Sequence, residues 1–291
     1  MANFYILIPR IKVSDCNLEA SHLSVCFPMM SLAGMIEHIR FQAKHRYRLS
    51  LTISQFLPLL IDYQVYQGMT KNPLSTCKGN GGKPAEKDLI NPPIIPEIKG
   101  KVEFSLIMKV NSNSTIENIQ SMLCKILDVA RFAGGHIFHY GAPCTYANLE
   151  ELLQQLTTHP FSWAISDRSD LLSTKDEKGK MYQLIEAVAM FHSEEDNTYH
   201  RKQKGWIFAM PNGYQMLEAP TQRPGTRPNQ DGEYYNHAFC EPTHTLAELV
   251  PISRLYQRAK AGQTDHEIKQ MKVFWKQVSD VENRRVMITT N

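Results

Sequence analysis

The sequence has little that would place the protein in a membrane or in an oxidising compartment. None of its apolar runs approaches the ~20 residues that a membrane-spanning helix needs. Its six cysteines include no Cys-x-x-Cys pair, and its start lacks the charged region and cleavage site of a signal peptide. We therefore expect a cytoplasmic protein with reduced thiols and no contact with membranes.

The sequence also lacks the local motifs of common enzymes. It has no G-x-S-x-G nucleophile elbow and no G-x-x-x-x-G-K-[ST] phosphate loop. His136 and His139 are spaced so that a strand would point them to opposite faces, which makes a poor metal pair. His237, Cys240 and His244 have no paired cysteines beside them. We expect no catalytic residue, no metal and no cofactor, so the sequence favours a binding or scaffold protein.

The overall composition is that of a soluble globular protein. The chain has 291 residues, of which 42% are hydrophobic and 21% charged, enough for one large domain or two small ones. The net charge is only +3, so any basic surface must be local.

The first half of the chain alternates strand and helix patterns. Between the second and third strands lies an arm, residues 69–100, rich in turn-forming residues and lysine. The order is β-α-β-β-α-β, which is that of a ferredoxin-like domain. A disordered surface insertion is the alternative interpretation of the arm. The expected elements are strands at 4–13, 51–68, 101–110 and 136–140 and helices at 31–39 and 116–130.

Two glycines follow the most regular of these helices. Ser114 and Glu117 form a capping-box pattern at its start, and Gly134-Gly135 is expected to end it. Arg131 would then lie at the C-terminal end of the helix. A glycine turn lets another backbone or a phosphate come close, although it can also be an ordinary helix cap.

Cations gather in three places that suit a nucleic-acid backbone. Arg10 and Lys12 alternate with apolar residues and so share one face of a strand. A dense basic cluster with interleaved aromatics follows the first helix, and lysines recur along the arm. Solvated surface charge is the alternative for each group. The residues predicted to contact a nucleic acid, which the family resemblance given below specifies as RNA, are Arg10, Lys12, Arg40, Lys44, Arg46, Arg48, Lys71, Lys83, Lys87, Arg131, Gly134, Gly135 and His136.

The second half of the chain shows shorter patterns. Asn212-Gly213 predicts the turn of a hairpin at 205–217, in which Trp206 and Tyr214 either pack or stack on a base. We predict a core at 1–145 with the arm 69–100, and a part at 146–291 that completes the fold with a helical insertion, the hairpin and C-terminal helices. The expected helices begin at Leu149, Met181, Leu246 and Ile268, and a short last strand is expected at 286–288.

Five short motifs occur in order along residues 4–141 and 205–220. They are Ile6-Leu7-Ile8-Pro9-Arg10-Ile11, Phe27-Pro28 with Leu32-Ala33-Gly34, Asn72-Pro73-Leu74, Arg131-Phe132-Ala133-Gly134-Gly135, and Gly205-Trp206 with Pro211-Asn212-Gly213-Tyr214. Together they resemble one known family, the RAMP subunit of type I-F CRISPR surveillance complexes, or Csy complexes, which caps the 5′ handle of the CRISPR RNA.

The resemblance implies a ferredoxin-like, RRM-like RAMP core with a thumb-like arm that folds over RNA. It implies a noncatalytic subunit of a ribonucleoprotein for antiviral defence. The implied partners are the CRISPR RNA, the large subunit, the repeated backbone subunit and, indirectly, the target DNA, whose sequence is read by base pairing. The alternative function is a metal-dependent endoribonuclease that cuts repeat RNA, supported only by the histidines His136 and His139.

Overall fold

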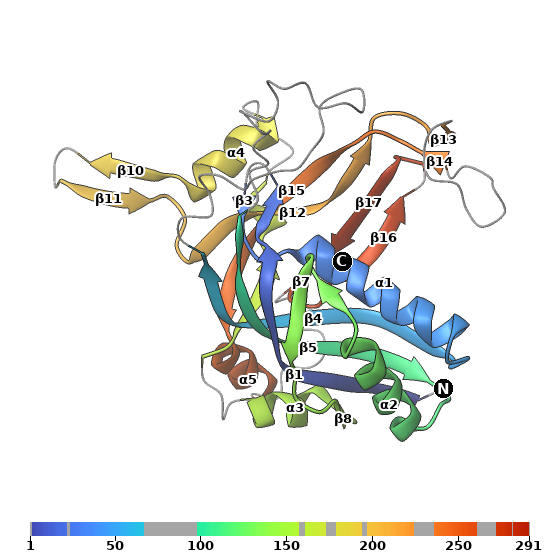
Figure 1. Ribbon diagram of the computed structural model, residues 1–291. Helices are drawn as coiled ribbons and strands as arrows, with labels where there is room; N and C mark the ends of the chain where they lie inside the picture. Colours follow the sequence, from blue (N-terminus) through green and yellow to red (C-terminus); the bar gives the residue numbers. More distant parts are fainter. Residues whose placement is uncertain are drawn as a thin grey trace, which may run out of the picture.

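The computed structural model describes residues 2–21, 24–66, 98–156, 161–172, 179–193, 197–223, 236–260, 272–280 and 282–290. One long, curled antiparallel sheet carries helices on both faces (Figure 1). Its first elements are β1 (Ala2–Asn17), β2 (Glu19–Ser21), β3 (Ser24–Val25), α1 (Met29–His45), β4 (Leu51–Val65), β5 (Lys99–Ser112), α2 (Ile116–Leu127), β6 (Arg131–Phe132), β7 (Gly135–His139) and β8 (Cys144–Tyr146).

The remaining elements extend the same sheet and add two small hairpins. They are α3 (Leu149–Leu156), β9 (Trp163–Asp167), the 3-10 helix η2 (Ser169–Leu171), α4 (Gly179–Val188), β10 (Met190–Ser193), β11 (Thr198–Arg201), β12 (Trp206–Met216), β13 (Thr221–Gln222), β14 (Asn236–His237), β15 (Cys240–Pro251), α5 (Ile252–Lys260), β16 (Lys276–Asp280) and β17 (Arg285–Thr289).

Three long strands of the first half and the short β7 pair in the order β4-β5-β1-β7. Each neighbouring pair is antiparallel. Helix α1 lies between β1 and β4 in the chain, and α2 lies between β5 and the β6–β7 hairpin. The expected order of strand, helix, strand, strand, helix and strand is therefore present in the described residues.

The apolar stripes of α1 and α2 cover one face of these strands. Leu32, Ile36 and Ile39 recur at helical spacing on α1 and are fully buried. They share one core with Leu123 of α2 and Phe104 of β5. Burial of each such side chain stabilises the fold by about 1.5–3 kcal/mol. This core holds both helices on a common face of the sheet.

A second core lies on the opposite face, beneath α3 and α5. Leu7 of β1 and Ile107 of β5 are buried there against Leu152 and Leu255. Ile107 interrupts the alternation of β5 in the sequence because this strand is buried on both faces. At the start of α3 the backbone N–H of Glu151 donates to Asn148 Oδ1 at 2.9 Å, so Asn148 caps the helix that was expected to begin at Leu149.

The sheet curls back on itself beyond β4. Successive pairings run from β4 through β9, β15, β12 and β17 to β16. Just before β16, Trp275 exchanges two backbone hydrogen bonds with Phe56 of β4, each 2.8 Å long. Its indole is fully buried and donates to the carbonyl oxygen of Ile165 at 2.9 Å. Trp275 thus connects the last strand of this series to β4 through backbone hydrogen bonds.

One predicted helix is wrong in its first part, and another is wrong in its described part. The helix expected from Leu246 is a strand as far as Pro251, whereas its residues 252–257 are helical and belong to α5. Leu246, Ala247 and Val250 belong to three different buried clusters, so β15 lacks the alternation that marks an ordinary strand. The described part of the predicted helix at 268–278 forms an extended segment that leads into β16. Residues 268–271 lie outside the described part of the chain. The C-terminal region therefore has more strand than the helical additions we expected.

The predicted turn at Pro211-Asn212-Gly213 is also wrong. Residues 206–216 form one strand, β12, with a register irregularity between Pro211 and Gly213. A Cβ atom at Gly213 would lie 2.3 Å from the carbonyl oxygen of Val286, so this glycine admits the backbone of β17. Strands from both sides of residue 145 join the same sheet. The division of the chain there remains a prediction.

Across the part of the chain with a described structure, no helix is long and apolar enough to cross a membrane.

Candidate nucleic-acid interface

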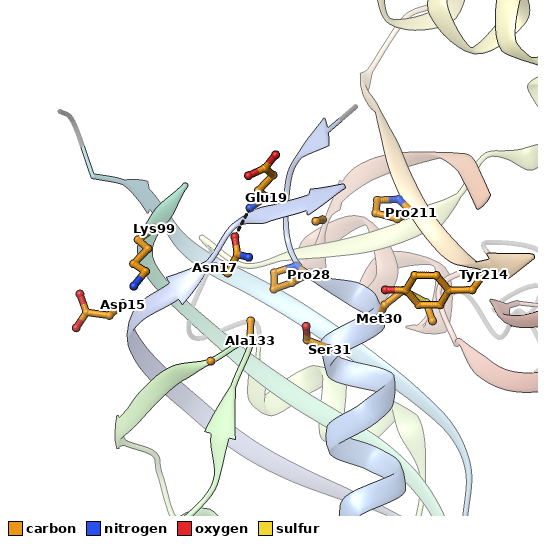
Figure 2. A pocket seen from close by; sticks show the side chains of 12 residues that line it. Asp15, Asn17, Glu19, Pro28, Met30, Ser31, Lys99, Ala133, Pro211 and Tyr214 are labelled. Carbon is orange, nitrogen blue, oxygen red and sulfur yellow. Dashed lines mark hydrogen bonds between the residues drawn. The ribbon is translucent and has the colours of Figure 1, made fainter. Parts of the chain in front are cut away.

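An open cavity of about 550 Å³ lies where segments far apart in the sequence meet (Figure 2). The end of β1 supplies Asp15 and Asn17, and the tip of the β6–β7 hairpin supplies Ala133 and Gly134. The start of α1, the first residue of β5 and part of β12 complete its wall. This cavity is therefore lined by residues from three of the five motifs that carry the family resemblance. They are the motifs around residues 28, 133 and 212.

Helix α1 presents its N-terminal end to this cavity. Pro28, Met30 and Ser31 line it, and no side chain caps the helix or places an acid in its first turn. The first N–H groups of a helix have no acceptor within the helix, and they carry partial positive charge. This end of α1 is therefore favourable for a phosphate or a carbonyl of a ligand.

The other polar groups of the cavity have mixed charge. Asp15 and Glu19 bring carboxylates, Lys99 brings a cation, and Asn17 Oδ1 accepts the backbone N–H of Glu19 at 2.9 Å. Tyr214 of β12 also lines the cavity and is 41% exposed. Carboxylates repel phosphates but accept hydrogen bonds from the amino groups of bases, and an exposed ring can stack on a base. The lining thus suits a single splayed nucleotide better than a polyphosphate.

The tip of the β6–β7 hairpin forms the part of the cavity wall beside the start of α1 (Figure 2). Ala133 and Gly134 have φ angles of 49° and 77°, the pair of positive values that a two-residue hairpin turn of type I′ needs. The chain leaves α2 at Leu127 and enters β6 at Arg131, so the prediction that Gly134-Gly135 ends the helix is wrong. Phe132 is fully buried and anchors the hairpin in the core.

Arg131 and His136 lie directly opposite each other on this hairpin. The two residues are partners in the antiparallel pairing of β6 and β7, and both side chains are exposed. Gly134 has open space around the position of a Cβ atom, whereas Gly135 is buried against β1. The structure therefore brings four of the predicted residues, Arg131, Gly134, Gly135 and His136, together beside or in the cavity.

Arg10 and Lys12 are already paired within the protein. Arg10 Nε lies 2.6 Å from one carboxylate oxygen of Glu103, and Lys12 Nζ lies 3.6 Å from the other. Their side chains are 49% and 33% exposed. Two cations that share one carboxylate retain a net charge of one, so this part of β1 attracts RNA less than two free cations would. Their predicted contact with RNA remains a prediction.

The basic cluster occupies the far end of α1. Lys44, Arg46 and Arg48 are exposed there, and the Arg46 guanidinium lies 5.7 Å from the centre of the Tyr47 ring. An α-helix rises 1.5 Å per residue, so 17 residues separate this cluster from the cavity by about 25 Å. The structure does not bring these cations to the cavity; a nucleic acid would need several nucleotides to reach both.

Arg40 has a structural contact that the sequence did not predict. Its guanidinium donates to Glu37 on the same helix and to the carbonyl oxygen of Ile53 on β4. These contacts hold α1 against β4. Arg40 therefore faces the sheet more than the solvent, and it differs from the exposed cations that follow it.

Three of the arm lysines, which were predicted to contact RNA, lie outside the described residues, as do Asn72-Pro73-Leu74. Lys71, Lys83 and Lys87 thus remain predictions. Lys99, the last lysine of the predicted arm, starts β5 and lines the cavity. The RNA-contact prediction omitted this residue, together with Asp15 and Glu19. Tyr214 was expected either to pack in a hairpin or to stack on a base, and its expected position in a hairpin did not predict its approach to α1.

The described residues contain no group of three or more His, Cys, Asp and Glu side chains that could hold a metal ion.

Comparison with known families gives one match over nearly the whole chain. A family model described as "CRISPR-associated protein (Cas_Csy2)" matches residues 6–286. None of the curated proteins matches the chain.

Proposed function

The chain belongs to the Cas_Csy2 family of CRISPR-associated proteins, subunits of the type I-F Csy complex, and from this we propose a specific role for it. It is a noncatalytic RNA-binding subunit that holds the single-stranded 5′ handle of the CRISPR RNA. It acts in the cytoplasm as part of a ribonucleoprotein for antiviral defence. Target DNA is read by base pairing with the guide, so the protein contacts the target indirectly.

The fold supports this role through its strand order. The order β4-β5-β1-β7, with α1 and α2 on one face, is that expected for a ferredoxin-like RAMP core. The sheet face opposite these helices carries Arg10 and Lys12 toward Glu103 and is partly covered by α3 and α5. In this proposal RNA follows the rim near the cavity, where the sheet is not covered by those two helices.

The convergence of three motifs on one cavity is the observation that carries the proposal. The cavity receives one base of the handle, with Tyr214 beside its ring and Asp15 or Glu19 at its amino groups. The adjoining phosphates pass the N-terminal end of α1 and the exposed Arg131. The cations at the end of α1 then contact a more distant part of the same RNA.

The protein partners follow from the family. We propose contacts with the large subunit and with the repeated backbone subunit of the complex. Cleavage of RNA by this chain is not part of the proposal, because membership of the Cas_Csy2 family supports the role of a structural subunit.

The test is RNA binding by the chain co-expressed with the products of neighbouring CRISPR genes and a repeat–spacer array. Arg131→Ala should lower the salt slope of handle binding by about one unit, as loss of one phosphate contact does. Tyr214→Ala should weaken binding by about 1–3 kcal/mol if its ring stacks on a base.

The control is Arg254→Ala, because this exposed arginine lies on α5, on the opposite face of the sheet. It should leave both quantities unchanged. Equal effects of Arg131→Ala, Tyr214→Ala and Arg254→Ala on RNA binding would contradict the assignment of the cavity as the RNA site. Unchanged RNA binding in Arg131→Ala and Tyr214→Ala would contradict it as well.

A further inference from the structure

Phe138 is an exposed aromatic residue on the short strand β7. Its side chain is 55% exposed, although the preceding residue, Ile137, is buried in the core under α1 and α2. The β1–β7 pairing shifts its register here, because Lys12 pairs with His139 whereas Val13 pairs with Ile137. Phe138 is therefore the extra residue of a β-bulge, a feature that redirects a side chain and is common beside functional sites. The bulge directs this ring away from the core that Ile137 fills.

The ring lies beside a part of the sheet that the helices leave uncovered. The outer face of the sheet, opposite α1 and α2, is buried by α3 and α5 along only part of its length. Farther along β1 and β5, the side chain of Lys12 is 33% exposed and Lys101 is exposed as well. Lys12 pairs with Glu103 across the two strands, and Glu103 and Lys101 are two residues apart on β5. These three residues therefore share the outer face.

Lys101 supplies a cation that its described neighbours do not neutralise. It makes no ion pair with another residue of the described structure. Lys12 is different, because it shares the carboxylate of Glu103 with Arg10. Neighbouring strands lie about 4.8 Å apart, so β5 and β7 are about 10 Å apart across β1. One nucleotide can bridge this span, with its base on the ring of Phe138 and a phosphate at Lys101.

The surroundings of Phe138 fit a base better than a protein partner. The centres of protein interfaces are depleted of charged residues. Phe138 instead has the cation Lys12 beside it, and the other exposed residues of β7 are His136 and His139, so the strand carries no continuous apolar patch. Surfaces that bind single strands combine cations along the backbone with separate rings on which bases stack. The observed arrangement is of this second kind.

The β6–β7 hairpin connects Phe138 to the RNA cavity. Gly134 at its tip lines the cavity, and Phe138 lies four residues farther along the chain. A strand rises about 3.3 Å per residue, which places the ring about 13 Å from the cavity wall. His136, between the two, is exposed opposite Arg131. A single strand that leaves the cavity can therefore follow exposed side chains of this hairpin to the outer face.

We propose that Phe138 stacks on a second base of the 5′ handle, different from the base in the cavity, and that Lys101 contacts an adjoining phosphate. The inference rests on the proposed function, since it places a further nucleotide of the same RNA. It gives roles to two residues outside the set that the sequence predicted.

The experiment titrates the full chain, assembled with its partner subunits, with synthetic RNA that carries the 5′ handle. A second set of RNAs carries an abasic site at one handle position each. Phe138→Ala is compared with Phe138→Trp, which keeps a ring for stacking, and with Phe161→Ala at another exposed phenylalanine. Lys101→Ala is compared with Lys109→Ala, which lies eight residues farther along the same strand.

We expect Phe138→Ala to weaken handle binding by about 5- to 150-fold, which corresponds to the loss of one stacked base. One abasic position should weaken binding by the unmodified chain to a similar extent and have no further effect in Phe138→Ala. Phe138→Trp, Phe161→Ala and Lys109→Ala should bind the handle as the unmodified chain does. Lys101→Ala should lower the salt slope of binding by about one unit.

Handle binding that Phe138→Ala leaves unchanged would overturn this inference alone. Abasic effects that all persist in Phe138→Ala would also overturn it, since no base would then depend on the ring. Loss of a protein subunit from the Phe138→Ala complex, with unchanged RNA affinity, would assign the ring to a protein contact and overturn it too. Failure of the unmodified complex to bind the handle would contradict the proposed function together with this inference.

Discussion

A Cβ atom on Gly135 would lie 2.5 Å from the carbonyl oxygen of Ser14. The two strands β7 and β1 are therefore packed at a distance that only glycine permits at this position. The backbone N–H of Asn17 also donates to the carbonyl oxygen of Ala133 at 2.9 Å. Together these contacts fix the tip of the β6–β7 hairpin at the cavity wall.

Gly135→Ala should displace the hairpin and destabilise the protein. Overpacking a tight site costs about 1–3 kcal/mol, which urea denaturation can measure. The control is Gly34→Ala, since the residue is in α1 and, apart from its chain neighbours and the backbone of its own helix, no atom lies within 4 Å of that Cβ position. It should stabilise the protein by about 0.5–1 kcal/mol. Equal effects of the two changes would contradict the close approach of β7 to β1.

The closure of the sheet depends on Trp275. Trp275→Ala removes a fully buried indole and its hydrogen bond to Ile165, so the free energy of unfolding should fall by about 3–5 kcal/mol. Trp275→Phe keeps much of the packing and should cost less. Trp206→Ala is the comparison, because Trp206 is 67% exposed and its loss should change stability by less than about 0.5 kcal/mol. A similar loss for both tryptophans would contradict the buried position of Trp275.

Glu103 limits the charge that Arg10 and Lys12 present. Glu103→Gln keeps the shape of the side chain but removes the carboxylate that pairs with both cations. If β1 contacts RNA as predicted, handle binding should become tighter and its salt slope steeper by about one unit. Unchanged binding and slope would show that Arg10 and Lys12 do not face the RNA.

From the burial of two thiols we predict that the free energy of unfolding falls at alkaline pH. Burial raises the pKa of Cys16 and of Cys26 from 9.0 to about 11. The unfolded chain releases these protons near pH 9, whereas the folded protein still holds them. The free energy of unfolding should therefore fall as pH rises from 9 towards 11.

Urea denaturation at pH 8, 9 and 10 measures this loss. The variant with both Cys16→Ala and Cys26→Ala is the control, and its stability should depend less on pH over this interval. An identical pH dependence in the variant would contradict the thiols as its cause.

The elements that sequence predicted best are those with one buried face. Helices α1 and α2 bury single stripes, and β5 alternates until Ile107, where both faces are covered. Strand β15 buries residues on both faces, so the spacing of its apolar residues in the sequence was interpreted as that of a helix. The local pattern could not show this because the covering layers come from distant segments.

The candidate site was predicted only in part, for a related reason. Arg131 and the glycines beside it were found because a glycine turn is visible in a short motif. Lys99 was not in the predicted set, and base stacking was only one of two alternatives for Tyr214, since only the pairing of distant strands brings these residues to α1. Arg40 was predicted to contact RNA, but its bond to Ile53 depends on the packing of α1 against β4. Charge patterns do not reveal such pairings.

The most direct test of the central claim is the sequence of RNA bound to the complex purified through this chain. The protein would be co-expressed with its neighbouring CRISPR gene products and a repeat–spacer array. We predict RNA of one length that begins with a constant 5′ handle, and its loss when Tyr214→Ala and Arg131→Ala are combined. Recovery of the chain free of nucleic acid, or with RNA of random sequence, would contradict the account.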